Sequence, residues 1–200
     1  MGNSVRSFRT AFRRRKAGNG GDPVRSLNAA LRRLWADHVI WTRQYLVAAI
    51  GDTPDVQAAA SRLLKNQEDI GNAVVPFYGQ AAGEALTGLL KEHILIAVEL
   101  VGAAKAGDNK RFAKEDARWT RNAEAIAELL SGANPNWVKK DVTDALMLHL
   151  MLTKQEAVAR LKGDWETDVE VFDQIFTEIL TIADVLTDGI VKQFAERFAA

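Results

Sequence analysis

From Leu27 onward, apolar residues recur at spacings of three and four residues, and this periodicity most constrains the fold. Apolar positions at i, i+3, i+4 and i+7 share one face of an α-helix, whereas a strand would show an alternation that this chain lacks. The pattern predicts an all-α protein, and a proline or a glycine stands near each expected helix boundary. We expect the main helices at residues 34–50, 54–75, 85–105, 109–131, 140–162 and 165–197, with a break in the last near Asp188-Gly189.

An internal repeat of about 56 residues divides the helical pattern into three parts, at about 30–85, 86–141 and 142–197. A Gly-Asp pair recurs at Gly51, Gly107 and Gly163, and each glycine is expected to end one helix before the aspartate caps the next. The sequence therefore predicts a six-helix bundle of three helical hairpins with pseudo-threefold symmetry. Residues 23–200 would form this single domain.

Three histidines occur in the chain, and they stand at intervals of 55 and 56 residues: His38, His93 and His149. Polar residues also recur 15 positions after each repeated glycine, at Asn66, Asn122 and Glu178. All six lie on the apolar stripe of an expected helix. Six polar side chains are thus predicted to face the core, where buried polar groups need partners.

Three neutral imidazoles with an open position suit a divalent transition metal such as zinc, iron or copper. The expected metal ligands are His38, His93, His149 and Glu178. The residues expected to orient them are Asn66, Asn122, Asp69, Thr42 and Thr153. An open coordination position would bind and ionise water, or activate dioxygen on a redox-active ion. The sequence indicates no substrate and no catalytic residue.

Two alternatives remain open. In the first, each histidine bonds the polar residue of its own hairpin and nothing binds, which an open row of hairpins would favour. The second concerns register, because the glycine follows the histidine by 13 positions in the first repeat and by 14 in the others. A gapless register would place Asp37 beside the other two histidines, as in the facial set of non-haem iron enzymes. The flanking residues Leu34 and Thr42 favour His38.

The formal net charge of the 200 residues is zero, but the charge is unevenly distributed. Residues 1–22 form a basic arm with six basic residues against one acidic residue, which leaves 20 basic and 25 acidic residues for the rest. We expect this arm to be flexible and to dock the bundle, as a structural or interaction protein, to a membrane surface, a polyanion or a larger assembly. The basic residues are Arg6, Arg9, Arg13, Arg14, Arg15 and Lys16.

Other classes of function are excluded by missing residues. The chain has no cysteine, so it has no disulfide, thiolate zinc site, iron–sulfur cluster or cysteine nucleophile. It also lacks the Glu-x-x-His, His-Glu-x-x-His, P-loop and Gly-x-Ser-x-Gly patterns. Neither a secretory signal nor a run of 18 apolar residues is present, so we expect a cytoplasmic protein, or one at the periphery of a membrane through its arm.

Three segments together resemble a widespread family of helical-bundle proteins with no established activity. They are Leu34…Asp37-His38…Trp41-Thr42, Asn66-Gln67-x-Asp69-Ile70-Gly71-Asn72 and Pro76-x-Tyr78-Gly79. The resemblance extends over about residues 30–195 and leaves out the basic arm. It implies the histidine register and no activity.

Overall fold

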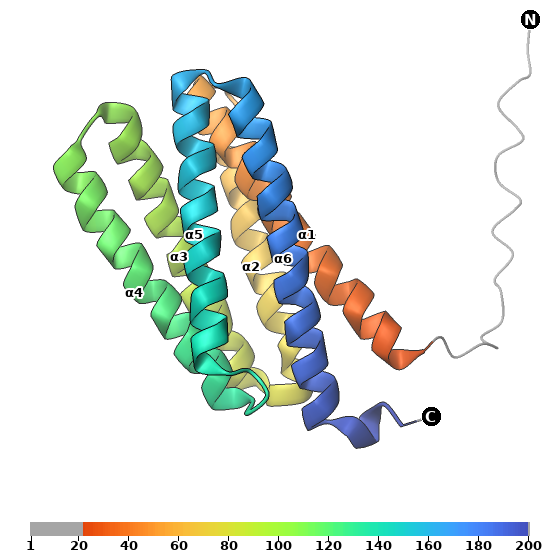
Figure 1. The fold of residues 1–200 in the computed structure, drawn as a ribbon. Helices are drawn as coiled ribbons and strands as arrows, with labels where there is room; N and C mark the ends of the chain where they lie inside the picture. The colour runs from red at the N-terminus through yellow and green to blue at the C-terminus, as the bar shows by residue number, and fades with distance from the viewer. Residues whose placement is uncertain (1–21, 200) are drawn as a thin grey trace, which may run out of the picture.

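The computed structural model describes residues 22–199, so the six basic residues of the arm lie outside the described residues. Within that range the chain is all-α, with no strand, as the periodicity predicts (Figure 1). The helices are α1 (Pro23–Gly51), α2 (Val56–Tyr78), α3 (Gln80–Ala106), α4 (Asn109–Ala133), α5 (Lys139–Lys162) and α6 (Trp165–Gln193), followed by the 3-10 turn η1 (Ala195–Arg197). The expected break at Asp188-Gly189 is absent, because α6 continues to Gln193.

The six helices close into a ring. Each helix packs against its neighbours in the chain, and α6 returns to pack against α1. Contacts also link α1, α3 and α5 pairwise, so these three helices line the axis of the bundle. The bundle is therefore closed, and residues at matching heights on the odd-numbered helices face one another.

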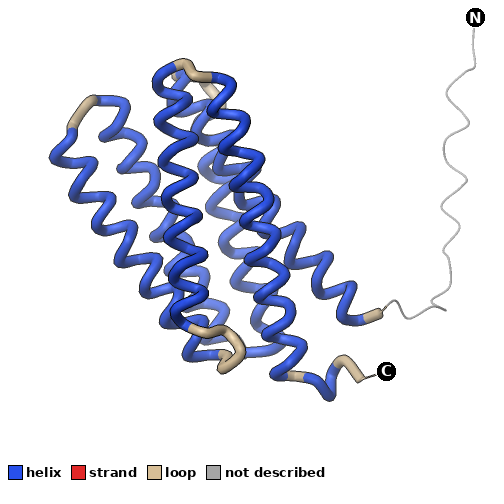
Figure 2. Tube along the Cα trace, in the orientation of Figure 1, coloured by secondary structure: helices blue, strands red, loops and turns tan. Residues whose placement is uncertain are grey.

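The turns within the three hairpins lie at one end of the bundle (Figures 1 and 2). Each first helix ends at a residue in the left-handed region: Asp52 at φ 55°, Gly107 at φ 68° and Gly163 at φ 72°. In the first hairpin this residue is Asp52 and not the expected Gly51, which is the last residue of α1. Asp52 follows His38 by 14 positions, as Gly107 follows His93 and Gly163 follows His149, so the irregular spacing arises because Gly51 stands one position before the left-handed residue.

The same backbone hydrogen bond closes all three turns. The residue after the left-handed position donates its N–H to an alanine carbonyl 3.0 Å away, at Ala48, Ala103 or Ala159. These alanines are almost fully buried, which lets the first helix of each hairpin end close to the axis. Asp108 and Asp164 then cap α4 and α6 through their side chains, as expected, whereas Asp55 makes no such bond before α2.

The opposite end of the bundle holds the α2–α3 and α4–α5 connections. The Tyr78 hydroxyl accepts a hydrogen bond from Asn134 at 2.9 Å and donates one to Gln193 at 2.9 Å. Trp137 from the α4–α5 connection packs directly on Gly189, where an added Cβ would lie 2.0 Å from the indole Nε1. The two connections and the end of α6 are thus tied together.

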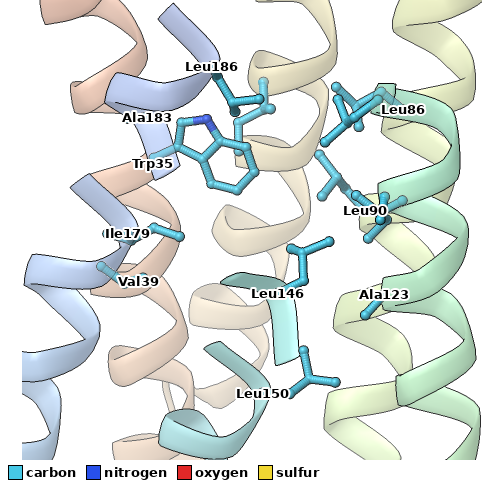
Figure 3. Packing of buried hydrophobic residues seen from close by; sticks show 14 of the residues in the cluster. Trp35, Val39, Leu86, Leu90, Ala123, Leu146, Leu150, Ile179, Ala183 and Leu186 are labelled. Atoms are coloured by element: carbon cyan, nitrogen blue, oxygen red, sulfur yellow. The ribbon is translucent and has the colours of Figure 1, made fainter. Parts of the chain in front are cut away.

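The apolar core runs along the axis between these ends. Trp35 of α1 lies beside Ala183 and Leu186 of α6 and faces Leu86 and Leu90 of α3 (Figure 3). No helix in residues 22–199 has both the length and the apolar character needed to cross a membrane.

Candidate functional site

The three histidines lie on the three axial helices and are buried, with exposed fractions of 3%, 4% and 4%. The ring centroids of His38 and His149 are 5.7 Å apart, with an angle of 41° between the planes. His93 packs against Trp119, with its ring centroid 5.0 Å from the indole. The closed bundle therefore brings His38 and His149 together, and His93 is close enough to interact electrostatically with both.

Each ring makes its hydrogen bond through Nδ1 to the second helix of its own hairpin. The distances are 3.2 Å from His38 to Gln67 Nε2, 2.9 Å from His93 to Asn122 Oδ1, and 3.0 Å from His149 to Glu178 Oε2. In all three hairpins the partner follows its histidine by 29 positions. The predicted partners Asn122 and Glu178 are thus in contact with their rings.

The first hairpin differs from the prediction. Gln67, and not Asn66, contacts His38, because the left-handed turn position from which the partner is counted is Asp52 and not Gly51. Asn66 instead donates to the Leu34 carbonyl at 3.0 Å. In the second hairpin Asn122 performs both tasks, since its Nδ2 donates to the Leu89 carbonyl at 3.1 Å. Counting from the histidine instead of the glycine would have identified Gln67 in the sequence.

These contacts fix where the protons of two rings lie. The Nδ2 group of Asn122 is committed to a carbonyl, so its Oδ1 faces His93 and the ring nitrogen must donate. Glu178 likewise presents a carboxylate oxygen to Nδ1 of His149. In a neutral ring with a proton on Nδ1, Nε2 holds a lone pair and points away from the Nδ1 partner. Nε2 of His93, whose ring burial keeps uncharged, is therefore an acceptor.

The hydrogen bond at Nδ1 of His38 runs in the opposite direction. Gln67 Nε2 also donates to the Leu63 carbonyl at 2.8 Å and to Asn66 Oδ1 at 3.2 Å, so it meets His38 as a donor. Nδ1 of His38 then accepts, and the ring proton lies on Nε2. The Oε1 atom of Gln67 is buried without a partner. A rotation of this amide would exchange donor for acceptor at the ring.

Burial keeps the rings of His38 and His93 uncharged. Loss of solvent lowers the pKa of His93 to about 3, with His149 adding to the effect. The pKa of His38 also falls well below its ordinary value, first through burial and then through His149 and His93. At neutral pH both rings are in the unprotonated form that binds metal ions.

Two carboxylates considered from the sequence lie away from the rings. Asp37 pairs with Arg62 at 3.3 Å, and Asp69 pairs with Lys65 at 3.0 Å. His38 thus holds the core position that the alternative register gave to Asp37. Asp69 does not orient a ring in this structure.

The two threonines predicted near the site line a small cavity one helical turn along the axis. The Thr42 hydroxyl donates to the His38 carbonyl at 2.8 Å, and the Thr153 hydroxyl to the His149 carbonyl at 2.9 Å. The cavity has a volume of about 20 Å³ and is also lined by Trp119, whose Nε1 has no hydrogen-bond partner. A volume of this size holds about one water molecule.

The side chains do not already form a closed coordination site. In the range 22–199, no three or more His, Asp or Glu side chains are grouped closely enough to hold a metal ion. The ring nitrogens would therefore have to draw together to share an ion.

A buried cluster of charges lies on the same face of α5, two turns beyond His149. Arg43 contacts Asp168 through both terminal nitrogens, at 3.0 and 2.9 Å, and Glu156 at 2.5 Å. Arg160 adds a bond to Asp168 at 2.9 Å. Burial raises the pKa of Glu156 to about 7 despite the opposing effect of Arg43. No sequence pattern joins Arg43 to residues more than a hundred positions away, so sequence reasoning missed this cluster.

Comparison of the chain with protein-family models, curated proteins and solved structures finds no match. The family resemblance of the sequence is therefore a resemblance alone, and function must be argued from the geometry.

Proposed function

We propose that the protein binds a divalent transition metal ion, such as zinc, iron or copper, at His38, His93 and His149. The observation that carries this proposal is the approach of the buried rings of His38 and His149, whose centroids lie 5.7 Å apart on two of the three axial helices. The third ring, that of His93, is close enough to interact electrostatically with both. Glu178 supports His149 as a carboxylate partner, in the arrangement that commonly orients metal-binding histidines.

The architecture proposed with this site is a pseudo-threefold repeat of about 56 residues. Its support is a regular spacing. In each hairpin the left-handed turn residue and the partner stand at the same distances in sequence from the histidine, the partner 29 positions after it. Such a repeat supplies one imidazole per hairpin at the same height. An ion on the axis is the ligand that fits three such groups at once.

Ion binding would require local movement. Gln67 would rotate its amide so that Oε1 accepts from Nδ1 of His38, which frees Nε2 of that ring. The rotation gives up the bonds of Nε2 to the Leu63 carbonyl and to Asn66 Oδ1, each worth about 0.5–1.5 kcal/mol net. Structural zinc sites in small domains bind with about 10–16 kcal/mol at pH 7. The gain is large enough to draw the three rings together.

The test is metal analysis of the full chain, expressed without a histidine tag, by plasma mass spectrometry after incubation with zinc and dialysis. We expect about one ion per chain in the wild type and none in His93→Ala. Asn134→Ala is the matched control, because it removes a fully buried polar side chain at the far end of the bundle and should keep the ion. An ion content that is the same in wild type and His93→Ala would overturn the proposal.

A second proposal concerns residues 1–22, whose excess of basic residues would dock the protein to an anionic surface. Sedimentation with vesicles containing phosphatidylserine tests it. The full chain should co-sediment at low salt, and a chain that starts at Asp22 should stay in solution. Equal sedimentation of both would contradict the docking role of the arm.

A further inference from the structure

The outer side of α5 carries a stripe of exposed apolar residues. Leu148, Met151 and Val158 stand three and seven positions apart, so they share one face of the helix. The first two, 42% and 45% exposed, line an open groove of about 790 Å³ between α5 and α6. By contrast, α1 and α3 each expose a single large apolar side chain, Ile40 and Leu95. An apolar patch of this kind on a folded surface marks a place where a partner binds.

The α6 side of the groove is acidic. Asp173 lines the groove, and the exposed Glu170 and Glu166 precede it at helical spacing on the same side of α6. None of the three forms an ion pair with another residue in the range 22–199. The residues that line the groove in that range include no lysine and no arginine. The groove therefore fits a partner that is apolar on one side and basic on the other.

The N-terminal arm of the same chain has this composition. Residues 1–21 contain six basic residues and no acidic residue. They also contain Val5, Phe8 and Phe12, whose spacing of three and four positions is typical of the anchors by which an amphipathic helix binds a groove. On a helix these anchors span about 10 Å, whereas the α6 wall from Asp173 to Ile182 spans about 14 Å. The apolar side of such a helix matches the groove in length.

The arm also joins the bundle close to the groove. Asn28 of α1 donates to Asp184 of α6 at 2.8 Å, whereas Arg43, farther along α1, contacts Asp168 at 2.9 Å. The two helices are therefore antiparallel, and α1 begins beside the last turns of α6. Because α5 packs against the other side of α6, the chain that enters at Asp22 reaches the groove by crossing one helix (Figure 1).

The arm is long enough for this path. Six residues of helix from Asn28 back to Asp22 span about 9 Å, and eleven from Asp184 to Asp173 span about 17 Å. The far end of the groove thus lies about 26 Å along the bundle from Asp22 and about 10 Å to the side, across α6. The ten residues from Phe12 to Asp22 span up to about 33 Å when extended. Phe12 can therefore reach the whole groove.

We propose that residues 5–16 dock in the groove between α5 and α6 of their own chain. Val5, Phe8 and Phe12 pack against Leu148 and Met151, and the basic side chains lie along the acidic residues of α6. Apolar burial and charge complementarity then act together, and the segment is held close by its attachment at the start of α1.

This interaction goes beyond both proposed functions and rests on neither. None of the three histidines lines the groove, so a chain that binds no metal should dock its arm unchanged. An anionic membrane surface would compete with the groove for the same arm. The experiment below contains neither metal nor lipid, so its result is independent of the metal and vesicle tests.

The test measures the distance between the arm and Met151 in the full chain by NMR. The chain has no cysteine, so Thr10→Cys provides a single position for a nitroxide, on the helix side away from Phe8. With ¹³C-methyl methionine, only Met1, Met147 and Met151 give signals, and Met151→Leu identifies the third. We expect the Met151 signal to lose most of its intensity relative to the reduced nitroxide.

A matched reporter and paired variants separate docking from random contact. Leu95→Met places a methionine at a position on α3 that is 52% exposed, and its signal should keep its intensity. Phe8→Ser combined with Phe12→Ser should restore the Met151 signal, because it removes the anchors and keeps the charge. Asp173→Lys should restore it as well, whereas Glu124→Lys, at an exposed position on α4, should not.

Four results would overturn the proposal. They are an unbroadened Met151 signal, equal broadening at position 95, and broadening that persists without the two phenylalanines. The fourth comes from mixing chains that carry only the nitroxide with chains that carry only the ¹³C label. Broadening of Met151 in that mixture would place the arm in the groove of a second copy instead of its own.

Discussion

Glu178 Oε2 lies 3.0 Å from Nδ1 of His149, and of the three histidine contacts this one alone involves a carboxylate. His38 and His93 are held by the neutral amides of Gln67 and Asn122. A carboxylate makes the opposite nitrogen of the ring a stronger ligand than an amide does. The three rings are thus held by electrostatically unequal partners, and in the proposed metal site His149 would be the strongest donor to the ion.

Glu178→Gln should therefore reduce zinc affinity by about 10- to 100-fold, measured by competition with a fluorescent chelator. The amide preserves the shape and the hydrogen bond while removing the charge. Glu115→Gln is the matched control, since Glu115 is buried on α4 but pairs with Lys114 and Arg118 at the surface. Zinc affinity that falls equally in both variants would assign the effect to general loss of charge.

Acid should destabilise the protein through its buried histidines. Because the folded pKa of His93 is about 3, the unfolded chain binds more protons than the folded chain between that value and the ordinary 6.5. Stability then rises with pH across this window, by up to about 1.4 kcal/mol per pH unit for one ring, and is lost as pH falls. Urea unfolding at pH 4, 5, 6 and 7 measures the free energy of unfolding. This free energy should fall less steeply with decreasing pH in His93→Gln than in the wild type. Parallel curves for wild type and variant would contradict the neutral buried ring.

Glu156 should have the opposite effect on the pH dependence. Its folded pKa of about 7 exceeds the ordinary 4.5, so the folded chain holds the extra proton between these values. Stability contributed by the protonated form is present below pH 4.5 and is lost as pH rises to 7, by about 3 kcal/mol in total. In Glu156→Gln this decline should disappear, because the amide cannot ionise. Urea unfolding over the same pH series measures this decline in the free energy of unfolding. The control is Glu124→Gln, at an exposed position, which should show the same pH dependence as the wild type.

Gly189 should tolerate no side chain. A Cβ there would lie 2.0 Å from Nε1 of Trp137, so Gly189→Ala should displace the indole and cost about 1–3 kcal/mol. Gly88 offers a matched helical control, since nothing lies within 4 Å of its Cβ position. Gly88→Ala should leave stability unchanged or raise it by up to about 1 kcal/mol. Thermal unfolding measures both, and equal melting temperatures would contradict the close packing of Trp137.

The helices could be predicted from the sequence because each buries one continuous apolar stripe, and a stripe is a local property. The first hairpin turn could not be placed to the residue. Asp52 takes the left-handed position although Gly51 stands next to it, because the backbone hydrogen bond to Ala48 sets where the helix ends. The partner follows the left-handed residue by 15 positions in each hairpin, so counting from Gly51 gives Asn66, whereas counting from Asp52 gives Gln67.

Contacts between helices that are distant in the sequence were harder to predict. The burial of His38, His93 and His149 follows from their stripes, but their approach to one another depends on the ring closing between α6 and α1. The bonds of Arg43 to Glu156 and Asp168 have the same origin, since they join α1 to the third hairpin. Local patterns specify which face of a helix is buried and leave open which partner that face meets.

The constant spacing of 29 positions between each histidine and its partner has a consequence for how such a chain can change. A ring and the group that holds it are encoded in one contiguous stretch shorter than a single hairpin. Duplication or exchange of a whole hairpin would carry both together, ready to engage the axis. If the hairpins arose in that way, the differences among Gln67, Asn122 and Glu178 would be separate substitutions, each changing the chemistry at one ring.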